Sequence, residues 1–265
     1  MGQPDRRRLR ETFNEAAELY DRARPGYPAA LFDDLATLSG IGPGCRVLEI
    51  GCGTGQATLS LAERGCEIVC IELGANMAAV AQRKLAGFSS CRVVVSAFED
   101  WPLPAEPFDV VVAATAFHWL DPAVRVTKAA EALRSDGTLA TIGTHHVAGG
   151  DAEFFAEVQS CYERWDPSTP AGVRLPSVAE IPLDSEELDR SGRFGPAIFR
   201  RYEWDLPYSA ATYLDTLLTY SGHRALAPEA RSNLLACIAH LIESRYGGRI
   251  TKRYMTELRV AHRRM

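Results

Sequence analysis

A run of glycines at alternate positions follows an apolar stretch near residue 50, and these residues are the part of the sequence best suited to bind a ligand. Residues 47–56 read VLEIGCGTGQ, with glycines at Gly51, Gly53 and Gly55. Glycine adopts positive φ angles and lets a ligand lie directly on the main chain. A helix beginning near Gly55 would add unpaired N–H groups and a partial positive charge. The pattern therefore predicts a ligand site at the end of the first strand of a doubly wound sheet.

Two acidic residues set this turn apart from a dinucleotide-binding turn. In G-x-G-x-x-G the third glycine would stand at position 56, where this chain has Gln56. Glu49 precedes the first glycine by two positions, and a carboxylate there suits a cationic ligand better than a pyrophosphate. Glu72 ends the next apolar run, about 20 residues further on, where a carboxylate can hold ribose hydroxyls. Binding of NAD and a purely structural turn remain the alternatives.

The sequence E-x-G-x-G-x-G, from Glu49 to Gly55, resembles the first motif of class I S-adenosylmethionine-dependent methyltransferases. This resemblance implies S-adenosyl-L-methionine as the cofactor and S-adenosyl-L-homocysteine as its product. It implies that Gly51, Gly53 and Gln56 surround the methionine portion. It also implies that Glu72 binds the ribose and that the neighbouring apolar side chain, Leu73, packs on the adenine.

The segment after the third expected strand corresponds to the loop that meets the adenine edge in the resembled family. Residues 96–101 read SAFEDW. The resemblance implies that Ala97 and Phe98 approach the adenine and that Glu99 is the acid for its amino group. Many relatives have Asp in place of Ala97, so this contact is either missing here or made by Glu99.

Two further segments resemble the methyltransferase branch that contains trans-aconitate methyltransferase. Residues 115–119 read TAFHW, and residues 20–28 read YDRARPGYP. The resemblance implies that Thr115 lies beside the reactive methyl group and that Tyr20 and Arg24 close over the cofactor. Core packing is the alternative for Tyr20, whereas a buried Arg24 needs a carboxylate partner. His118 is the candidate catalytic base, with a place in the pocket wall as its alternative role.

Composition and charge argue against several other classes of function. The chain has 265 residues, 46% hydrophobic and 24% charged, with a net charge of −5, which argues against nucleic acid as a partner. Arginines cluster only near the ends, at residues 6–10 and 259–264. No apolar run is long enough for a membrane span. The seven cysteines form no C-x-x-C pair, so we expect no metal site. With no export signal, they favour reduced thiols and a cytoplasmic location.

The alternation of apolar runs and amphipathic segments predicts the fold class. We expect an α/β fold with a doubly wound, Rossmann-like, seven-stranded sheet, in which five parallel strands precede a late antiparallel pair and a helical cap covers the glycine turn. The expected strands are 46–50, 67–71, 92–96, 108–113, 138–143, 194–206 and 250–260. The expected helices are 9–23, one from Pro28 to about residue 40, 55–64, 74–86, 122–134, 152–164, 210–220 and 229–246.

The same pattern predicts one methyltransferase domain over residues 1–265. Within it we expect an N-terminal helical lid at 1–40 and a cofactor-binding core at 41–150. We expect a cap with the sixth strand at 151–246 and the final strand at 247–265. In this arrangement the first two helices and the inserted helices close over the glycine turn.

The resemblance to the trans-aconitate methyltransferase branch implies methyl transfer to a small molecule, with a carboxylic acid as the favoured acceptor. A carboxylate is ionised at neutral pH and needs no base, whereas a hydroxyl or amine would need one of His118, His145 or His146. A carboxylate would need cations, for which Arg174, Arg193 and Arg200 are the candidates. A cofactor-binding module without catalysis is the alternative, and an NAD-dependent oxidoreductase is a weaker one.

Overall fold

A single mixed sheet of seven strands organises the computed structural model, which describes residues 12–264. The strand order is β3-β2-β1-β4-β5-β7-β6. Strands β1 to β5 pair in parallel with their neighbours, and β7 pairs antiparallel with both β5 and β6. The predicted fold class is therefore confirmed. The strands are β1 (Arg46–Ile50), β2 (Glu67–Glu72), β3 (Cys91–Val95), β4 (Phe108–Ala114), β5 (Leu133–Gly150), β6 (Ile198–Ser209) and β7 (Arg249–His262).

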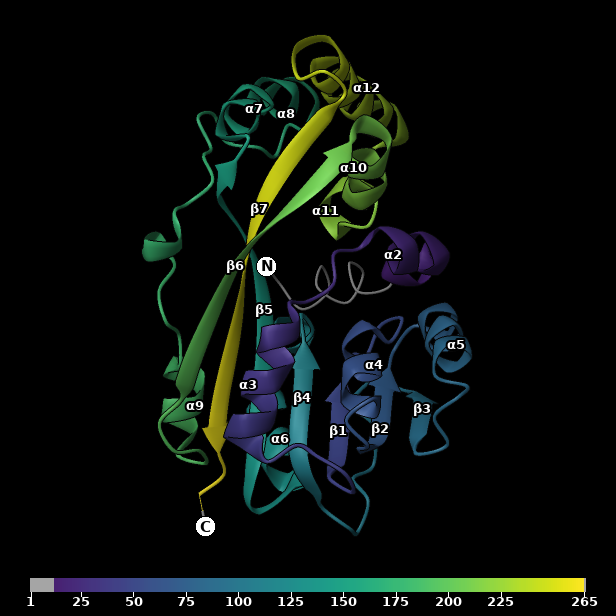
Figure 1. Cartoon of the computed structure of the whole chain (residues 1–265), viewed down its shortest axis with the longest axis vertical. Helices are drawn as coiled ribbons and strands as arrows, with labels where there is room; N and C mark the ends of the chain where they lie inside the picture. The colour runs from purple at the N-terminus through teal and green to yellow at the C-terminus, as the bar shows by residue number, and fades with distance from the viewer. Residues whose placement is uncertain (1–11, 265) are drawn as a thin grey trace.

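Helices cover both faces of the sheet and also form a cap at one end of its long strands (Figure 1). Within residues 12–165 they are α2 (Ala17–Ala23), α3 (Ala29–Ser39), α4 (Gln56–Ala62), α5 (Ala75–Lys84), η1 (Phe117–Trp119), α6 (Arg125–Ala132), α7 (Ala152–Glu157) and α8 (Gln159–Trp165). In the remainder of the described chain they are η2 (Val178–Glu180), α9 (Glu186–Ser191), α10 (Ala210–Leu217), α11 (Ser221–Ala225) and α12 (Pro228–Arg245).

The strand β5 is much longer than the predicted 138–143, because β7 continues to pair with it beyond the parallel part of the sheet. The antiparallel ladder runs from Thr138 opposite His262 to His146 opposite Tyr254, then shifts register and ends at Gly150. Gly150 has φ +60°, and a Cβ there would lie 2.2 Å from the carbonyl oxygen of Thr251. The glycine that we expected to end the core thus lets the strand reach into the cap.

The N-terminal helices differ in their positions. The predicted helix 9–23 begins outside the described residues, and it is interrupted before α2 at Ala16, whose φ is −128°. The helix α3 packs its buried side chains Leu31, Phe32 and Leu35 against the sheet. Of these two helices only α2 lies over the glycine turn, so the expectation that both contribute to the cap is wrong for α3.

Residues beyond Gly150 depart most from the sequence-based boundaries. The predicted helix 152–164 is two helices, α7 and α8, and the predicted helix 210–220 is α10 followed by α11. The strand β6 begins at Ile198 rather than residue 194, since Phe194 makes only an isolated bridge to Arg263. The short helix α9 was not predicted, because its six residues give too little periodicity.

The cap has its own apolar core around the upper ends of β6 and β7 (Figure 1). A disulfide joins Cys161 of α8 to Cys237 of α12 within this core. The expectation of reduced thiols is wrong for this pair, because spacing along the sequence gives no sign that the two helices meet. None of the helices described is both long and apolar enough to cross a membrane.

Candidate active site

The glycine turn forms one wall of a cavity of about 500 Å³ at the carboxyl ends of β1, β2 and β4. Gly51, Gly53 and Gly55 all have positive φ angles, of 67°, 59° and 84°. A Cβ on Gly51 would lie 2.6 Å from the Cβ of Ala116, so only glycine fits this position. The main chain between β1 and α4 is therefore shaped by the glycines that the sequence singled out.

Glu72 at the end of β2 fixes the turn and also faces the cavity. Its Oε2 accepts a hydrogen bond from the Gly53 N–H at 2.9 Å, and its Oε1 accepts one from the Gly74 N–H at 2.8 Å. Each carboxylate oxygen has more than one lone pair, so both oxygens can still accept bonds from a diol. The next residue, Leu73, lines the cavity together with Met77 and Phe98. This wall can hold a ribose beside a flat apolar ring.

Two of the three residues expected at the adenine edge lie outside the cavity lining. Phe98 lines the cavity, whereas Ala97 and Glu99 do not. The Oε1 of Glu99 accepts a hydrogen bond from the Asp121 N–H at 3.1 Å, and its backbone carbonyl accepts one from Lys128 Nζ at 2.8 Å. Glu99 thus holds the segment after η1. The neighbouring Ser96, which we did not predict, takes part in the lining.

The fourth strand ends in a strained residue that faces the cavity. Thr115 has φ +51°, which is uncommon for a β-branched residue. Its backbone N–H donates to the Ile142 carbonyl at 2.7 Å, and its hydroxyl lies 3.0 Å from the Tyr27 hydroxyl. His118 and Trp119 follow in η1 and line the same cavity. Strain of this kind clusters at functional sites.

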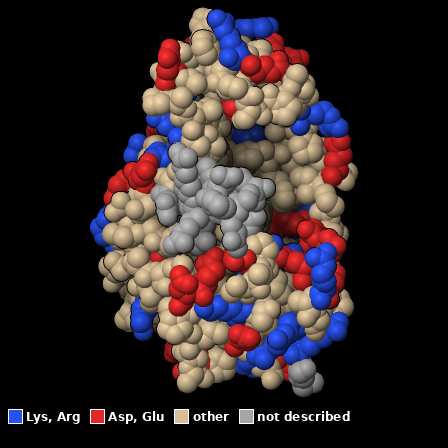
Figure 2. Space-filling model, turned by 180° about the vertical axis from the view of Figure 1, so that it is seen from behind, with Lys and Arg blue, Asp and Glu red and all other residues tan. Residues whose placement is uncertain are grey.

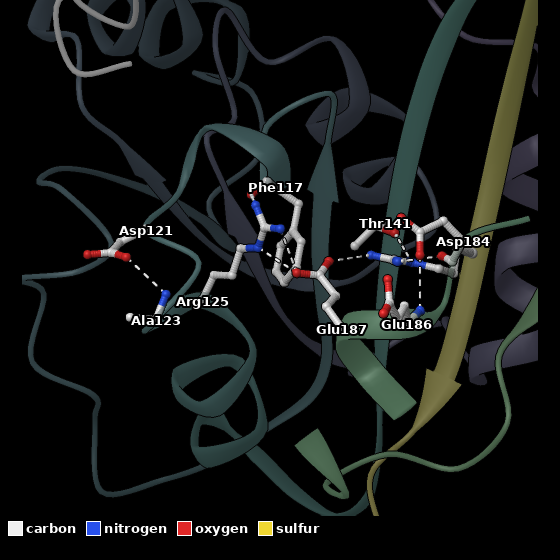
Figure 3. A network of polar contacts seen from close by, with 9 residues as sticks. Phe117, Asp121, Ala123, Arg125, Thr141, Asp184, Glu186 and Glu187 are labelled. Atoms are coloured by element: carbon white, nitrogen blue, oxygen red, sulfur yellow. Dashed lines mark hydrogen bonds and ion pairs between the residues drawn. The ribbon is translucent and has the colours of Figure 1, made fainter. Parts of the chain in front are cut away.

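A network of ion pairs behind η1 holds it against the sheet (Figure 3). Arg125 donates from Nη1 to the Phe117 carbonyl at 3.1 Å and from Nε to Glu187 at 2.7 Å. Glu187 also pairs with Arg259 of β7 at 3.2 Å. The unpredicted helix α9 therefore carries the carboxylate that ties η1 to β7.

The opposite wall comes from α2, the upper part of β5 and α11. Tyr20 and Arg24 line the cavity, as the resemblance implied. The Arg24 guanidinium lies 4.3 Å from the centroid of the Tyr220 ring, and its Nη1 donates to Thr219 Oγ1 at 3.3 Å. Within residues 12–264, Arg24 forms no ion pair with a carboxylate. A cation that is shielded from water without a carboxylate partner is costly in free energy. An anionic group of a ligand would offset this cost by pairing with the Arg24 guanidinium.

A small recess of about 30 Å³ adjoins the main cavity and shares Arg24 and His146 with it. Gln56 lines this recess, and its Nε2 has no hydrogen-bond partner in the part of the chain described. Glu49 does not line either cavity, but it is 1% exposed and its Oε2 likewise has no partner there. Burial raises the pKa of Glu49 to about 8. Arg24 and Gln56, which can donate hydrogen bonds, thus lie near the recess together with the acid Glu49. The Gln56 amide and the Glu49 carboxyl group can still form hydrogen bonds with a ligand.

His145 and His146 both line the cavity from β5. Burial, together with Lys252 and Arg24, lowers the pKa of His146 to about 3. Burial also lowers the pKa of His145. His223 lies further into the cap, where its Nε2 is 2.9 Å from the Tyr162 hydroxyl and burial lowers its pKa to about 4. His145 and His146 thus belong to the site rather than to a solvated loop.

Several lining residues could not be found from motifs. Phe13, Trp119, Tyr220 and Ser221 reach the cavity from separate segments. Hydrophobic periodicity identifies such aromatic residues as buried, but it does not distinguish a pocket wall from a core. None of the expected acceptor-binding cations Arg174, Arg193 and Arg200 lines the cavity. Arg174, for instance, pairs with Glu180 on the surface.

The strand order, the positive-φ glycine turn and the acid ending β2 together define a class I methyltransferase fold around a nucleoside-sized cavity. Residues 47–137 match the model of the family described as a methyltransferase domain. Residues 47–137 of this chain therefore resemble the cofactor-binding core of a class I S-adenosylmethionine-dependent methyltransferase. The site fits that cofactor, since Arg24 and the Gln56 amide have bonding capacity for its amino-acid end and Glu72 for its ribose.

Proteins of known sequence and structure agree with this assignment. An uncharacterized methyltransferase of Mycobacterium tuberculosis is 33% identical over 137 residues, which cover 52% of this chain and 54% of the relative. The malonyl-[acyl-carrier protein] O-methyltransferase of Geobacter sulfurreducens is 32% identical over 175 residues, which cover 64% of this chain and 63% of the relative. The chain thus matches between about half and two thirds of the length of these two relatives.

Solved structures share the fold at low sequence identity. The YcgJ protein from Bacillus subtilis has a TM-score of 0.54 at 18% identity, covering 90% of this chain and 100% of the other. Phosphoethanolamine N-methyltransferase 2 from Haemonchus contortus, in complex with S-adenosylhomocysteine, has a TM-score of 0.54 at 15% identity, covering 95% of this chain and 58% of the other. These similarities extend the shared fold well beyond residues 47–137.

Proposed function

We propose that the protein transfers a methyl group from S-adenosylmethionine to a carboxylate oxygen of a small molecule. The observation that carries this proposal is the charge of the cavity. Glu72, at the ribose end, is its only acid among the described lining residues, and Arg24 is the permanent cation among them. Burial lowers the pKa of His145 and of His146, so these two side chains line the cavity in their neutral form. A cation without an acidic partner favours an anionic ligand.

Lys252 of β7 strengthens this positive field from behind the wall. Its side chain is buried, with the residue 4% exposed, and Nζ lies 4.3 Å from the centroid of the Phe155 ring. The Lys252 ammonium group forms no ion pair or hydrogen bond with residues 12–264 and instead lies over the rings of Phe155 and Tyr254. Lys252 is the charged group that contributes most to lowering the pKa of His146. If Arg24 binds the cofactor's carboxylate, Lys252 still favours a negative charge at the acceptor end.

The cofactor roles that the sequence predicts belong to the same proposal. Gly51, Gly53 and Gln56 would surround the methionine portion, and Arg24 would bind its carboxylate. Glu72 would hold the ribose. Leu73 and Phe98 would contact the adenine, while Thr115 and Tyr20 would flank the reactive centre. The support is that all of these residues line the two adjoining cavities.

The acceptor chemistry follows from these charges. The bound cofactor supplies an electrophilic methyl group on a sulfonium. The residues of this chain have only to orient a carboxylate, which is ionised at neutral pH, and to exclude water from the closed cavity. On this account His118 is a wall residue rather than a base, and its ring lies 5.0 Å from that of Trp119.

A small acceptor fits the surface as well as the cavity. Basic and acidic side chains are interspersed over the face drawn in Figure 2, and the net charge is −5. The relative from Geobacter sulfurreducens is named as an O-methyltransferase of a malonyl group that is carried on the acyl-carrier protein. That name supports oxygen as the methylated atom, whereas the small size of the acceptor rests on the cavity.

The proposal is tested by the chemistry of the product. The protein is incubated with S-adenosylmethionine carrying a labelled methyl group and with pools of small carboxylic acids, amines and phenols. A methyl ester releases volatile labelled methanol in mild base, whereas methylated amines, carbons and phenols keep the label. We expect base-labile label from the acid pool. Stable label from another pool, or no transfer to any pool, would contradict the proposal.

A further inference from the structure

The carboxyl group of Glu49 is buried next to the glycine turn and has no charged partner. It lies on β1, opposite Cys70 of β2, and the residue is 1% exposed. Its Oε2 has no hydrogen-bond partner in the described part of the chain. A carboxylate without a partner in such a place is strongly disfavoured, so the neutral acid is the stable form.

The groups around Glu49 do not compensate a negative charge. The charged neighbour that contributes to its pKa is Glu72 of β2, which raises it further. Thr58 of α4 lies close enough to lower it in part, but its Oγ1 is not in hydrogen-bonding geometry with any group described. Cys52, Tyr27 and Cys91, each with a pKa raised by its surroundings, are further titratable neighbours. None of these groups carries a positive charge.

Three other polar atoms near the start of α4 share this lack of partners. Thr54 Oγ1, Gln56 Nε2 and Thr58 Oγ1 are buried without a hydrogen bond in the described structure. Native proteins leave few such atoms unsatisfied. Of these three residues Gln56 lines the recess, together with Arg24 and with Tyr27, whose pKa is raised in part by Glu49. The recess thus has Arg24 for a negative group of a ligand and Glu49 close by for a positive one.

We infer that Glu49 is a neutral acid in the free protein and ionises when the ammonium group of the cofactor's amino-acid end binds, so that cofactor recognition releases a proton. The proton leaves Glu49 for the solvent, and the carboxylate pairs with the incoming ammonium. Burial, which disfavours the lone charge, also strengthens the resulting pair. An adenosine derivative without the amino acid cannot drive this ionisation, so Glu49 selects for the complete cofactor. The inference rests on the proposed use of S-adenosylmethionine.

The test is calorimetry of S-adenosylhomocysteine binding to the whole protein at pH 7 in two buffers of different ionisation enthalpy. We expect release of about one proton for each molecule bound. Between pH 6 and 8 the Kd should become about tenfold tighter for each pH unit, because one proton is lost on binding. 5′-Methylthioadenosine has the adenosine and thioether but lacks the amino acid, and it should bind without proton release.

Glu49→Gln separates this linkage from protons exchanged by other groups of the cavity. The variant should bind S-adenosylhomocysteine with no proton release and a flat pH dependence, and its affinity for 5′-methylthioadenosine should stay within about twofold of the wild type. Binding of S-adenosylhomocysteine to the wild type without proton release would overturn the inference, and so would proton release that persists in the variant. Absence of any binding would instead count against the proposed function. If the variant does not fold, the wild-type measurements still decide whether a proton is released when S-adenosylhomocysteine binds.

Discussion

The two ends of the cavity are built in different ways. The cofactor end is formed by one continuous stretch, in which Gly51, Gly53 and Glu72 shape and fix the main chain. The acceptor end is assembled from side chains of three separate segments, around residues 115–120, 143–146 and 220–221. A short motif can therefore specify the cofactor, whereas the acceptor depends on how distant segments pack together.

The two ends also differ in how their charges are satisfied. At the cofactor end, Glu72 accepts hydrogen bonds from two backbone N–H groups. At the acceptor end, Lys252 has no acidic partner within residues 12–264, and His146 is held neutral. The predictions below separate these two ends, beginning with the largest expected effect.

The disulfide should stabilise the cap without affecting the cofactor end. Replacing both Cys161 and Cys237 by Ser should lower the free energy of unfolding by about 2–5 kcal/mol, because the unfolded chain regains the freedom of a long closed loop. Thermal unfolding with and without the substitutions measures this. Cys91→Ser, at a free thiol of β3, is the control and should have a smaller effect. Loss of S-adenosylhomocysteine binding in a folded double variant would show that the two ends are not separable.

Acid should destabilise the cap through its buried histidines. His146 and His223 have pKa values lowered to about 3 and about 4, whereas an unfolded histidine titrates near 6.5. The unfolded state therefore binds protons first, and the free energy of unfolding should fall as the pH drops below about 6.5. At pH 5 this amounts to about 2 kcal/mol for each histidine.

Chemical denaturation at pH 7 and pH 5 measures this acid effect. His146→Gln should remove about half of the pH dependence, whereas His240→Gln, at an exposed position of α12, should leave it unchanged. An unchanged pH dependence in His146→Gln would show that His146 is not held neutral by its surroundings.

Glu72 tests the cofactor end. Glu72→Ala should weaken S-adenosylhomocysteine binding by about 1–3 kcal/mol, or about one to two decades in Kd, because the ribose loses its acceptor and the Gly53 and Gly74 N–H groups lose theirs. Glu99→Ala is the control, since Glu99 holds the Asp121 N–H and does not line the cavity. An equal loss in both variants would place Glu99 at the adenine after all.

The segment that joins the two ends should respond to ligand. Residues 12–27 contain Tyr20 and Arg24, and the Ala23 carbonyl accepts a hydrogen bond from Thr216 Oγ1 of α10 at 3.1 Å. If this segment opens to admit the cofactor, S-adenosylhomocysteine should slow its amide hydrogen exchange. Residues of α3, which pack on the sheet, should change less. Equal exchange rates with and without S-adenosylhomocysteine would show that residues 12–27 do not act as a lid.

The smallest effect is expected in the pH dependence of catalysis. A carboxylate acceptor should give a kcat/KM that is nearly flat from about pH 6 to 9. A flat profile alone does not exclude His146 as a base, because its pKa of about 3 lies below this range. His146→Gln should therefore lower kcat by less than about tenfold, since general base catalysis is worth more. A larger loss in kcat at unchanged KM would make His146 catalytic.

The sequence was informative where local residue types decide the structure. The spaced glycines, the acid at the end of β2 and the alternation of strands and helices led to the fold class and to a ligand site at the end of β1. It failed where distant packing decides, as for the length of β5, the placement of α3 and the Cys161–Cys237 pair. Glu99 illustrates the difference, since its carboxylate holds the segment after η1 rather than lining the cavity.

The central claim is that the glycine turn, Glu49 and Glu72 form a site for an adenosyl amino acid rather than for a dinucleotide. Calorimetric titration of the protein with S-adenosylhomocysteine and with NAD, under the same conditions, tests it most directly. The account predicts saturable one-to-one binding of S-adenosylhomocysteine and a much weaker or undetectable response to NAD. Tighter binding of NAD than of S-adenosylhomocysteine would contradict it.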